Sequence, residues 1–234
     1  ATSLEAMTSQ KFDVLVIGGG VTGAGIALDA AARGLSTAVV DGQDWAAGTS
    51  SRSSRLVHGG LRYLYNLDFK LVAEALRERG RLLTTIAPHL VEAQPFLWPL
   101  KTPVIERAYS AVGVGMYDAL ARIGSKGRKT VPIQRHLSKA GAMRRFPEIK
   151  RNALVGAIEF YDARVDDARL VITLIRTAVK YGAAAASRVK VTEVLKDGRG
   201  RACGVKAVDL ENGNEFTIEA DRIINATGVW TEQT

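Results

Sequence analysis

Short apolar runs and glycine-rich breaks alternate near the start of the chain. Phe12–Ile17 is a largely continuous apolar run, which is typical of a buried parallel strand. A glycine turn follows it, and an alanine-rich segment then predicts a helix over about Thr22–Arg33. Thr37–Val40 returns as a second strand, which ends at Asp41. Together these segments predict a strand–helix–strand unit with parallel strands.

Two further helices are indicated by an acidic N-terminal cap followed by an apolar face. Asp68 begins one that runs to about Ile86, and another begins near Asp166 and stops at Gly182. Three short strands with hairpin turns follow, and a last apolar strand, Arg222–Asn225, enters an Ala-Thr-Gly turn. The expected hairpin strands are Lys190–Leu195, Gly204–Leu210 and Glu215–Glu219. This order predicts an α/β fold: a doubly wound, Rossmann-like nucleotide-binding domain with a three-stranded β-meander, plus part of a substrate or cap lobe.

Composition divides the chain into four stretches. Residues 1–10 are polar and are expected to form a flexible tail. Residues 11–87 and 153–234 are expected to be the first and second parts of the nucleotide-binding domain. Residues 88–152 hold all six prolines and predict an irregular, separate lobe. Within this lobe, Lys101–Arg151 carries twelve Lys and Arg residues against three acidic ones, so it accounts for the whole net charge of +8.

A basic stretch of this kind suits an anionic partner, such as a phosphorylated substrate, an acidic lipid or a nucleic acid. An exposed and solvated surface explains the charge equally well. The apolar run Val14–Ala32 is long, but its glycines and Asp29 favour a strand–helix unit over a membrane span. The single cysteine, Cys203, excludes an internal disulfide and a multi-cysteine metal site, and His89 and His136 stand alone. We therefore expect no metal.

The strongest motif is the glycine loop between the first strand and the first helix. It matches the G-x-G-x-x-G pattern at Gly18, Gly20 and Gly23. Gly18 permits a tight turn, Gly20 lets the backbone approach a pyrophosphate, and Gly23 lets helix and strand pack closely. The helix N-terminus presents unpaired N–H groups to an anion. Asp41 can accept hydrogen bonds from ribose hydroxyls and would repel a 2′-phosphate, so the motif favours FAD or NAD over NADP.

Four blocks, in order, resemble the FAD-dependent glycerol-3-phosphate dehydrogenases. They are Ile17–Gly34 (IGGGVTGAGIALDAAARG), Gly48–Tyr65 (GTSSRSSRLVHGGLRYLY), Tyr161–Leu170 (YDARVDDARL) and Asn225–Trp230 (NATGVW). The resemblance implies a Rossmann-like FAD-binding domain in an enzyme that oxidises sn-glycerol 3-phosphate to dihydroxyacetone phosphate. Electrons would pass from FAD to membrane quinone, or to oxygen in the oxidase branch of the family. It also implies that family members continue well beyond Thr234, so that this chain is an incomplete portion.

The resemblance assigns cofactor contacts by position. The expected FAD-binding residues are Gly18, Gly20, Gly23, Asp41, Thr49, Ser50, Ser51, Ser53, Val189, Ala226, Thr227 and Gly228. Gly18, Gly20 and Gly23 would hold the pyrophosphate, and the Val189 backbone would meet the adenine. Many flavin relatives carry Glu at the position of Asp41, so the chain departs slightly from the pattern there.

Three residues of the HGGLRY segment, His58, Arg62 and Tyr63, fall where the family places its substrate pocket. Oxidation of a secondary alcohol requires loss of the hydroxyl proton, and a histidine titrates near neutral pH. We therefore hypothesise that His58 assists the proton transfer, that Arg62 supplies positive charge and that Tyr63 donates a hydrogen bond. A loop histidine bonded to the backbone beside Gly59 and Gly60 is the alternative for His58.

The expected partners are sn-glycerol 3-phosphate, quinone and an acidic membrane surface, with a homodimer left open. The enzyme would lie peripherally on the cytoplasmic face of the membrane, where the basic lobe and its apolar segment Val112–Ile123 could contact lipid. A flavin amine or amino-acid oxidase shares the nucleotide loop, but the HGGLRY block argues against it. A nucleic-acid module remains a third alternative, although the chain has no known nucleic-acid motif.

Overall fold

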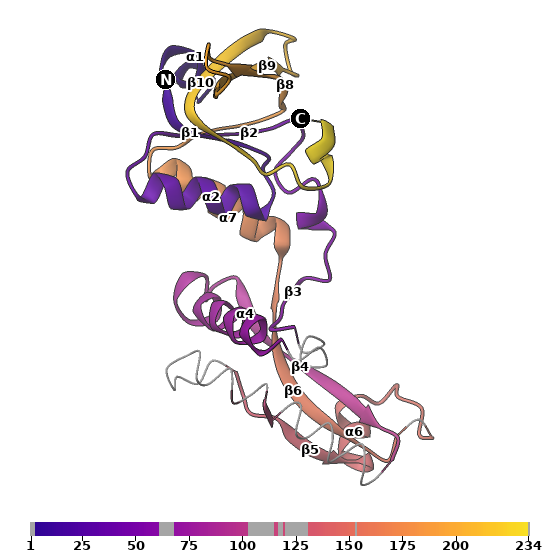
Figure 1. The fold of residues 1–234 in the computed structure, drawn as a ribbon. Coiled ribbons are helices and arrows are strands. Elements are labelled where there is room, and N and C mark those ends of the chain that lie inside the picture. The colour runs from indigo at the N-terminus through magenta and orange to yellow at the C-terminus, as the bar shows by residue number, and fades with distance from the viewer. Residues whose placement is uncertain are drawn as a thin grey trace. The chain divides into compact units, whose positions relative to one another are not determined.

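The structure is a computed structural model of the 234-residue chain (Figure 1). The residues it describes are 3–60, 68–102, 115–116, 119, 131–152 and 154–233. Two compact units divide the chain between them. Unit 1 comprises Ala1–Ser54 and Asp166–Thr234, and unit 2 comprises Arg55–Val165.

Unit 1 contains a six-stranded sheet with the order β7-β2-β1-β10-β9-β8. Its strands are β1 (Phe12–Ile17), β2 (Thr37–Asp41), β7 (Ala184–Ser187), β8 (Val189–Lys196), β9 (Ala202–Asp209) and β10 (Glu215–Asn225). β1 runs parallel to both neighbours, and Ile17 at its end is in register with Val40 and Asn225. The parallel strands therefore finish together at one edge. At the other end of β1, the Lys11 ammonium donates a hydrogen bond to the Asp221 carboxylate, which lowers the pKa of Asp221.

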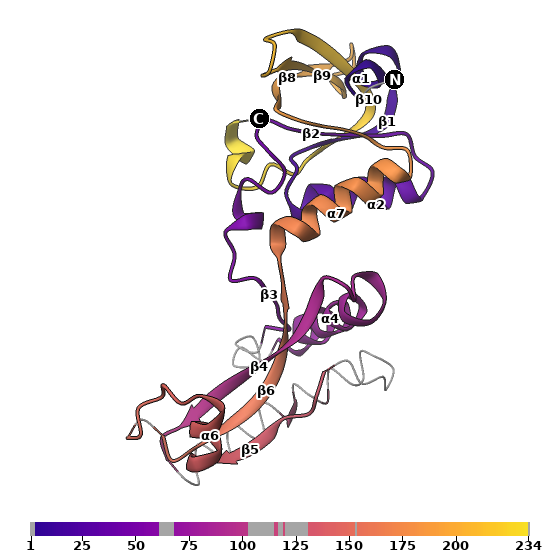
Figure 2. The ribbon, with the colours of Figure 1, turned by 180° about the vertical axis from the view of Figure 1, so that it is seen from behind.

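Both faces of the parallel part of this sheet, β7, β2, β1 and the second half of β10, are covered, as parallel strands require. Helices α2 (Val21–Ala32) and α7 (Asp167–Lys180) pack together on one face, which Figure 2 shows from behind. Small side chains on α2, among them Ala24 and Ala27, are fully buried and let the helix approach the strands closely. The other face is covered by the meander and the N-terminal helix α1 (Ser3–Ser9). The predicted α/β, Rossmann-like fold class is confirmed.

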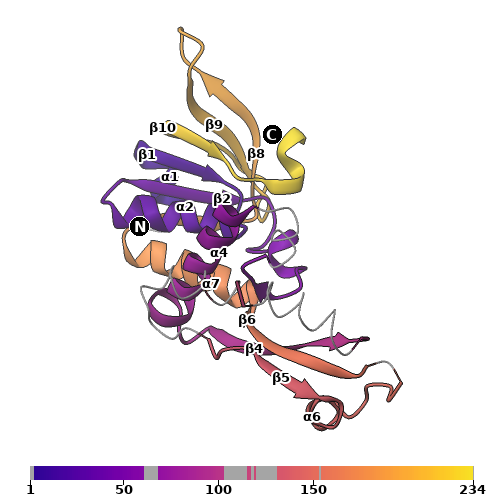
Figure 3. The ribbon, with the colours of Figure 1, turned by 60° about the horizontal axis from the view of Figure 1, so that its bottom comes forward.

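The predicted three-stranded meander is present as β8, β9 and the first half of β10 (Figure 3). Its last strand differs from the prediction. Glu215–Glu219 and Arg222–Asn225, expected as two strands, are parts of one continuous strand. The first half of β10 pairs antiparallel with β9 and the second half pairs parallel with β1. No Gly or Pro interrupts this stretch, so the chain has no local reason to break.

Residues 3–9 form helix α1, where a flexible tail over residues 1–10 was expected. Met7 on this helix is only 1% exposed and belongs to the same core as Phe12 and Leu15. Ser3 Oγ also accepts a hydrogen bond of 3.2 Å from the Ala185 amide of β7. A helix of seven residues carries too short a periodic pattern to be recognised from sequence.

Unit 2 is built on an antiparallel sheet in which β6 pairs with three other strands. Its elements are β3 (Leu56–Val57), α4 (Phe69–Arg81), the π-helical turn η2 (Leu82–Ile86), β4 (Val91–Leu100), β5 (Arg135–Ser138), α6 (Lys139–Arg145) and β6 (Gly156–Val165). The ten residues of β4 run the full length of β6, and the Phe96 and Phe160 rings stack with their centroids 5.5 Å apart. In Figure 3, β4, β6 and β5 lie side by side.

The proline-rich region is more regular than its composition suggested. Pro95 and Pro99 lie inside β4, which pairs with β6 alone among the described strands. Proline is tolerated on such an edge strand because its missing N–H removes no bond from the paired side.

The division of the chain also differs from the expected boundaries at residues 87/88 and 152/153. Because α4 and β6 pack within the unit 2 fold, the units divide at Ser54 and Val165.

The predicted helix caps are present. Asp68 accepts a hydrogen bond of 3.1 Å from the Leu71 amide, and Asp166 accepts one of 3.0 Å from the Arg169 amide. Each carboxylate satisfies an amide that the helix itself leaves unpaired. Among the described residues, no helix combines the length and the apolar character needed to cross a membrane.

The packing of α1 gives a prediction for stability. Met7→Ala is expected to lower the free energy of unfolding by about 2–5 kcal/mol, because it leaves a cavity under the sheet. Thr8→Ala, on the exposed side of the same helix, should change it by no more than about 0.5 kcal/mol. Urea unfolding of both variants, followed by circular dichroism, measures the difference. Equal and small effects would show that the N-terminal helix is not part of the core.

Candidate functional site

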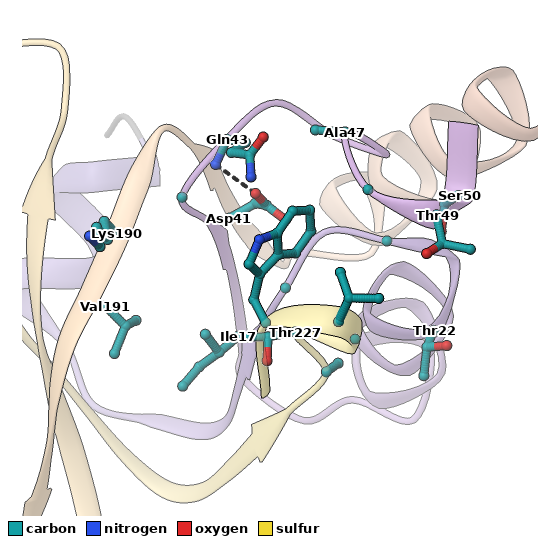
Figure 4. Close-up of a pocket in the computed structure, with 18 of the residues that line it drawn as sticks. Ile17, Thr22, Asp41, Gln43, Ala47, Thr49, Ser50, Lys190, Val191 and Thr227 are labelled. Carbon is teal, nitrogen blue, oxygen red and sulfur yellow. Dashed lines mark hydrogen bonds between the residues drawn. The ribbon is translucent and has the colours of Figure 1, made fainter. Parts of the chain in front are cut away.

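A cavity of about 540 Å³ lies at the edge of unit 1 where the parallel strands end (Figure 4). Ligand pockets in proteins have volumes of roughly 300–1,000 Å³, and doubly wound folds bind ligands beyond the carboxyl ends of their strands. Lys190 and Val191 lie at one end of the cavity and Thr22 and Ser50 at the other, with Asp41 between them. Among the predicted cofactor residues, its lining includes Gly18, Gly20, Asp41, Thr49, Ser50, Val189, Ala226, Thr227 and Gly228.

The glycine loop begins where three strands come closest. Gly18 has a φ of +113°, and a Cβ atom at this position would lie 2.5 Å from the carbonyl oxygen of Ala226. The Gly18 amide donates to the Val40 oxygen at 2.8 Å, and the Ala226 amide donates to the Ile17 oxygen at 2.8 Å. Gly18 is therefore required both by its backbone conformation and by the backbone beside it.

Gly20 and Gly23 are required for different reasons. A Cβ on Gly20 would lie 3.0 Å from Ser50 Oγ and would occupy the side of the loop that lines the cavity. A Cβ on Gly23 would lie only 1.8 Å from the Gly18 carbonyl oxygen, so Gly23 allows the loop to close on itself. Gly23 does not line the cavity, and its part in the site is the close packing expected from the motif.

The N-terminus of α2 opens onto the cavity. Its N-cap residue is Gly20, which offers no side chain to the first amides of the helix. The Val21 amide instead donates a hydrogen bond of 2.9 Å to Ser50 Oγ, and both Val21 and Thr22 line the cavity. The positive end of the helix dipole and the amides of the first turn make this end a favourable site for an anion.

Asp41 has two structural bonds in addition to its place in the cavity wall. Its Oδ2 accepts from the Gly19 amide at 2.6 Å. Its Oδ1 accepts from the Gln43 amide at 2.7 Å, the bond drawn in Figure 4. A carboxylate has about four acceptor positions, so two remain for a ligand hydroxyl. The side chain therefore fixes the glycine loop to the end of β2 while it faces the cavity.

The serine-rich loop divides between the cavity and the protein. Thr49 and Ser50 line the cavity, as expected. Ser51 and Ser53 do not line it, which differs from the prediction. Ser51 Oγ donates to the Gly48 oxygen at 3.4 Å, and Ser53 Oγ donates to the Asp167 carboxylate at the start of α7. These two hydroxyls therefore hold the loop in place.

The rest of the cavity wall is formed by β8 and by the segment after β10. Val189 is 1% exposed and lines the cavity at the start of β8. The residue before it, Arg188, has a φ of +58° and donates its amide to the Gln43 oxygen at 2.9 Å. Beyond β10, the Asn225 carboxamide oxygen accepts from the Thr227 amide at 3.1 Å and from the Thr227 hydroxyl at 2.7 Å. Both segments are thus held by hydrogen bonds within the protein.

Sequence reasoning missed part of the lining. The additional residues include Gln43, Ala47, Lys190, Val191, Leu210, Val229 and Trp230. Lys190 and Val191 directly follow Val189, which was predicted to contact the cofactor. Their position on the same strand, β8, could have indicated that they also line the cavity. Trp230 lies in the quoted NATGVW block, and a Cβ on Gly48 would come within 2.7 Å of its ring. A Cβ on Gly19, a variable position of the motif, would lie 2.3 Å from the Trp45 ring.

Of the predicted substrate residues, the structure describes His58 alone. Arg62 and Tyr63 lie outside the described residues. His58 follows β3 in unit 2 and is exposed, and its Nδ1 accepts a hydrogen bond of 3.0 Å from the Gly60 amide. This is the backbone bond that the alternative interpretation expected. An acceptor Nδ1 places the proton of the neutral ring on Nε2. In the described part of the chain, no group of three His, Cys, Asp or Glu residues could hold a metal ion.

Comparison with known proteins places this geometry in a family. Residues 13–234 match the family described as FAD dependent oxidoreductase. The glycerol-3-phosphate dehydrogenase of Mycobacterium leprae is 50% identical over 233 residues, which are 100% of this chain and 39% of that protein. The mitochondrial glycerol-3-phosphate dehydrogenase of Rattus norvegicus is 43% identical over 244 residues, covering 99% of this chain and 33% of that protein.

A solved structure gives the same result for the fold. The glycerol-3-phosphate dehydrogenase from Bacillus halodurans, complexed with FAD, matches with a TM-score of 0.70 and 31% identity. The match covers 97% of this chain and 36% of that one. This chain thus spans well under half the length of these relatives. The family match extends over nearly all of its residues, and the chain belongs to the FAD dependent oxidoreductase family.

Proposed function

We propose that this chain binds FAD in the cavity of unit 1 and takes part in the oxidation of sn-glycerol 3-phosphate to dihydroxyacetone phosphate. The observation that carries the proposal is the convergence of the glycine loop, Asp41 and the turn after β10 on one cavity. The 50% identity to the glycerol-3-phosphate dehydrogenase of Mycobacterium leprae supports the choice of substrate.

The chemistry of the cavity fits FAD. The α2 N-terminus suits a diphosphate, since its N-cap Gly20 carries no side chain and the positive end of the helix dipole faces the cavity. Ser50, whose Oγ accepts from the Val21 amide, keeps its own hydroxyl hydrogen to donate to a phosphate oxygen. The remaining acceptor positions of Asp41 suit the ribose hydroxyls, and the Val189 backbone suits the adenine. Thr49 and Ser50 would donate hydroxyl hydrogen bonds on the side of α2. When bound, FAD supplies the acceptor for the hydride.

The residues of unit 2 would handle the proton of the substrate hydroxyl. To accept it at Nε2, His58 must carry its own ring proton on Nδ1, and its hydrogen bond from Gly60 must then open. Proton transfer and rearrangement of the His58–Gly60 turn are thus linked in this proposal. Arg62 would bind the phosphate or a developing alkoxide by charge, and Tyr63 would direct a hydrogen bond to the substrate.

We extend the proposal to the electron acceptor and the location of the enzyme. Quinone would accept the electrons, and the protein would lie peripherally on the cytoplasmic face of a membrane. The twelve basic residues of Lys101–Arg151 and the apolar segment Val112–Ile123 support this association through attraction to acidic lipid and insertion of apolar side chains.

Reduction of the bound flavin tests the proposed reaction. The purified protein, with any sequence that naturally flanks this chain, should be yellow and should bleach when sn-glycerol 3-phosphate is added without air. Absorbance near the flavin maximum follows the reduction. A protein that holds FAD but is not bleached by this substrate would contradict the choice of reaction while leaving the cofactor assignment intact.

His58→Ala tests the proton-transfer role. The variant is expected to keep its flavin, because the FAD cavity is lined by unit 1. Its rate of flavin reduction should fall by about 10²–10⁴-fold, the usual contribution of a general base. Stopped-flow absorbance under anaerobic conditions measures this rate. A normal reduction rate in a flavin-replete variant would remove His58 from the mechanism.

Vesicle binding tests the membrane contact. Co-sedimentation with vesicles that contain anionic lipid should be strong at low ionic strength and should weaken as salt is added, since screening reduces the attraction. Vesicles of neutral lipid serve as the control. Equal binding to both kinds of vesicle would exclude a contact based on the basic stretch.

A further inference from the structure

A buried ion pair connects α4 to the central strand of unit 2. Arg79 Nη1 lies 2.7 Å from Asp162 Oδ1, with side-chain exposures of 1% and 7%. The same Nη1 is 3.4 Å from the carbonyl oxygen of Tyr161. Among the ion pairs between described residues, this is the one in which both side chains are buried. Because two charges leave water here, the pair requires an explanation.

Arg79 occupies a position where the helix pattern calls for an apolar side chain. Val72 and Leu76 are buried on α4, and Arg79 continues the same face at the next helical spacing. Replacing a buried ion pair with well-packed apolar residues of similar volume is often neutral or stabilising, so stability alone does not account for this pair. A buried ion pair has a property that they lack, since its geometry specifies one rotation and one register of the helix on the strand.

Asp162 lies one residue along β6 from Ala163, the partner of Val57 at the end of β3. On one side, Asp162 is in register with Gln94 of β4. On the other side, β3 pairs with β6 through Leu56 with Arg164 and Val57 with Ala163. His58 and Asp162 are the next residues along each strand beyond the Val57–Ala163 pair. The ion pair therefore fixes β6 at the position where the chain leaves β3 for the predicted substrate segment.

We propose that Arg79 and Asp162 are positioning residues for His58. The pair holds α4 and β6 in one arrangement, and β6 in turn sets the end of β3 from which His58 extends. The inference rests on the proposed function, because it requires His58 to act in substrate oxidation. It adds a role for two residues that lie within unit 2 and outside the FAD cavity.

A double-mutant cycle tests whether Arg79 acts through His58. In the full protein with bound FAD, Arg79→Met should lower the rate of flavin reduction by sn-glycerol 3-phosphate by about 10–100-fold, since small misplacements of a catalytic group have effects of this size. In a His58→Ala background, the same substitution should lower the rate by less than about 3-fold, because the group it positions is gone. The FAD dissociation constant should stay within about 2-fold.

The exposed ion pair on the same helix provides a matched control. Arg81 Nη1 lies 2.6 Å from Glu78 Oε1, and the two side chains are 58% and 50% exposed. Arg81→Met removes the same kind of charge from α4 and should leave the reduction rate within about 2-fold of the wild-type rate. A loss equal to that of Arg79→Met would assign the effect to the charge of the helix and would overturn the proposal.

A second variant separates positioning from stability. Arg79→Met/Asp162→Leu removes both charges, so it should fold even if Arg79→Met does not. Its melting temperature should approach that of the wild type, yet its reduction rate should stay about 10-fold or more below it, because apolar contacts do not fix the orientation. Recovery of both quantities would show that the pair is only structural.

An unchanged rate in Arg79→Met, or additive effects with His58→Ala, would also overturn the proposal. If the wild type holds FAD but is not reduced by the substrate, the proposed function fails instead.

Discussion

Backbone groups from three distant segments meet at the end of β1, and the space between them admits no Cβ atom. A Cβ on Gly18 would come within 2.5 Å of the Ala226 oxygen, while the Gly18 amide is bonded to the Val40 oxygen. β1, β2 and β10 can therefore finish at one edge, beside a cavity whose lining includes the glycine loop and Ala226. The nucleotide site depends on this close approach, because it brings the first helix, Asp41 and the segment after β10 together.

The same contacts hold the site in place, so the binding of an anion costs little further conformational entropy. Asp41 is fixed by the Gly19 and Gln43 amides, and the loop that carries Thr49 and Ser50 is tied by the Ser53 hydroxyl to Asp167. Groups held this way lose little conformational freedom when a ligand binds. In unit 2, His58 is also bonded to backbone, but through the nitrogen whose protonation state its proposed chemistry must change.

The sequence was most informative where function and backbone geometry impose the same residue type. Glycines at fixed spacing after an apolar strand, with Asp41 at the end of the next one, predicted the fold and the core of the cavity. Helix caps at Asp68 and Asp166 were likewise predicted, because one side chain and one amide suffice to make them. These features are local, so a linear pattern can reveal them.

Features that depend on distant contacts could not be predicted. Met7 is buried by strands that follow it in the sequence, and a helix of seven residues has no clear period of its own. The partner of Ser53 lies 114 residues away, so nothing nearby separated it from the serines that face the cavity. Arg79 is polar at an apolar position, and this mismatch was a signal, but its partner Asp162 was identified only from the fold.

The affinity for FAD of two glycine variants of α2 and its loop tests the central claim most directly. Gly20 lines the cavity, whereas a Cβ on Gly25, one turn further, would meet nothing within 4 Å. If the diphosphate rests on the glycine loop, Gly20→Val should weaken FAD binding by about 100-fold, or ~2.7 kcal/mol, and Gly25→Ala by less than about 2-fold. Equal affinities in the two folded variants would place the diphosphate elsewhere and would contradict the account.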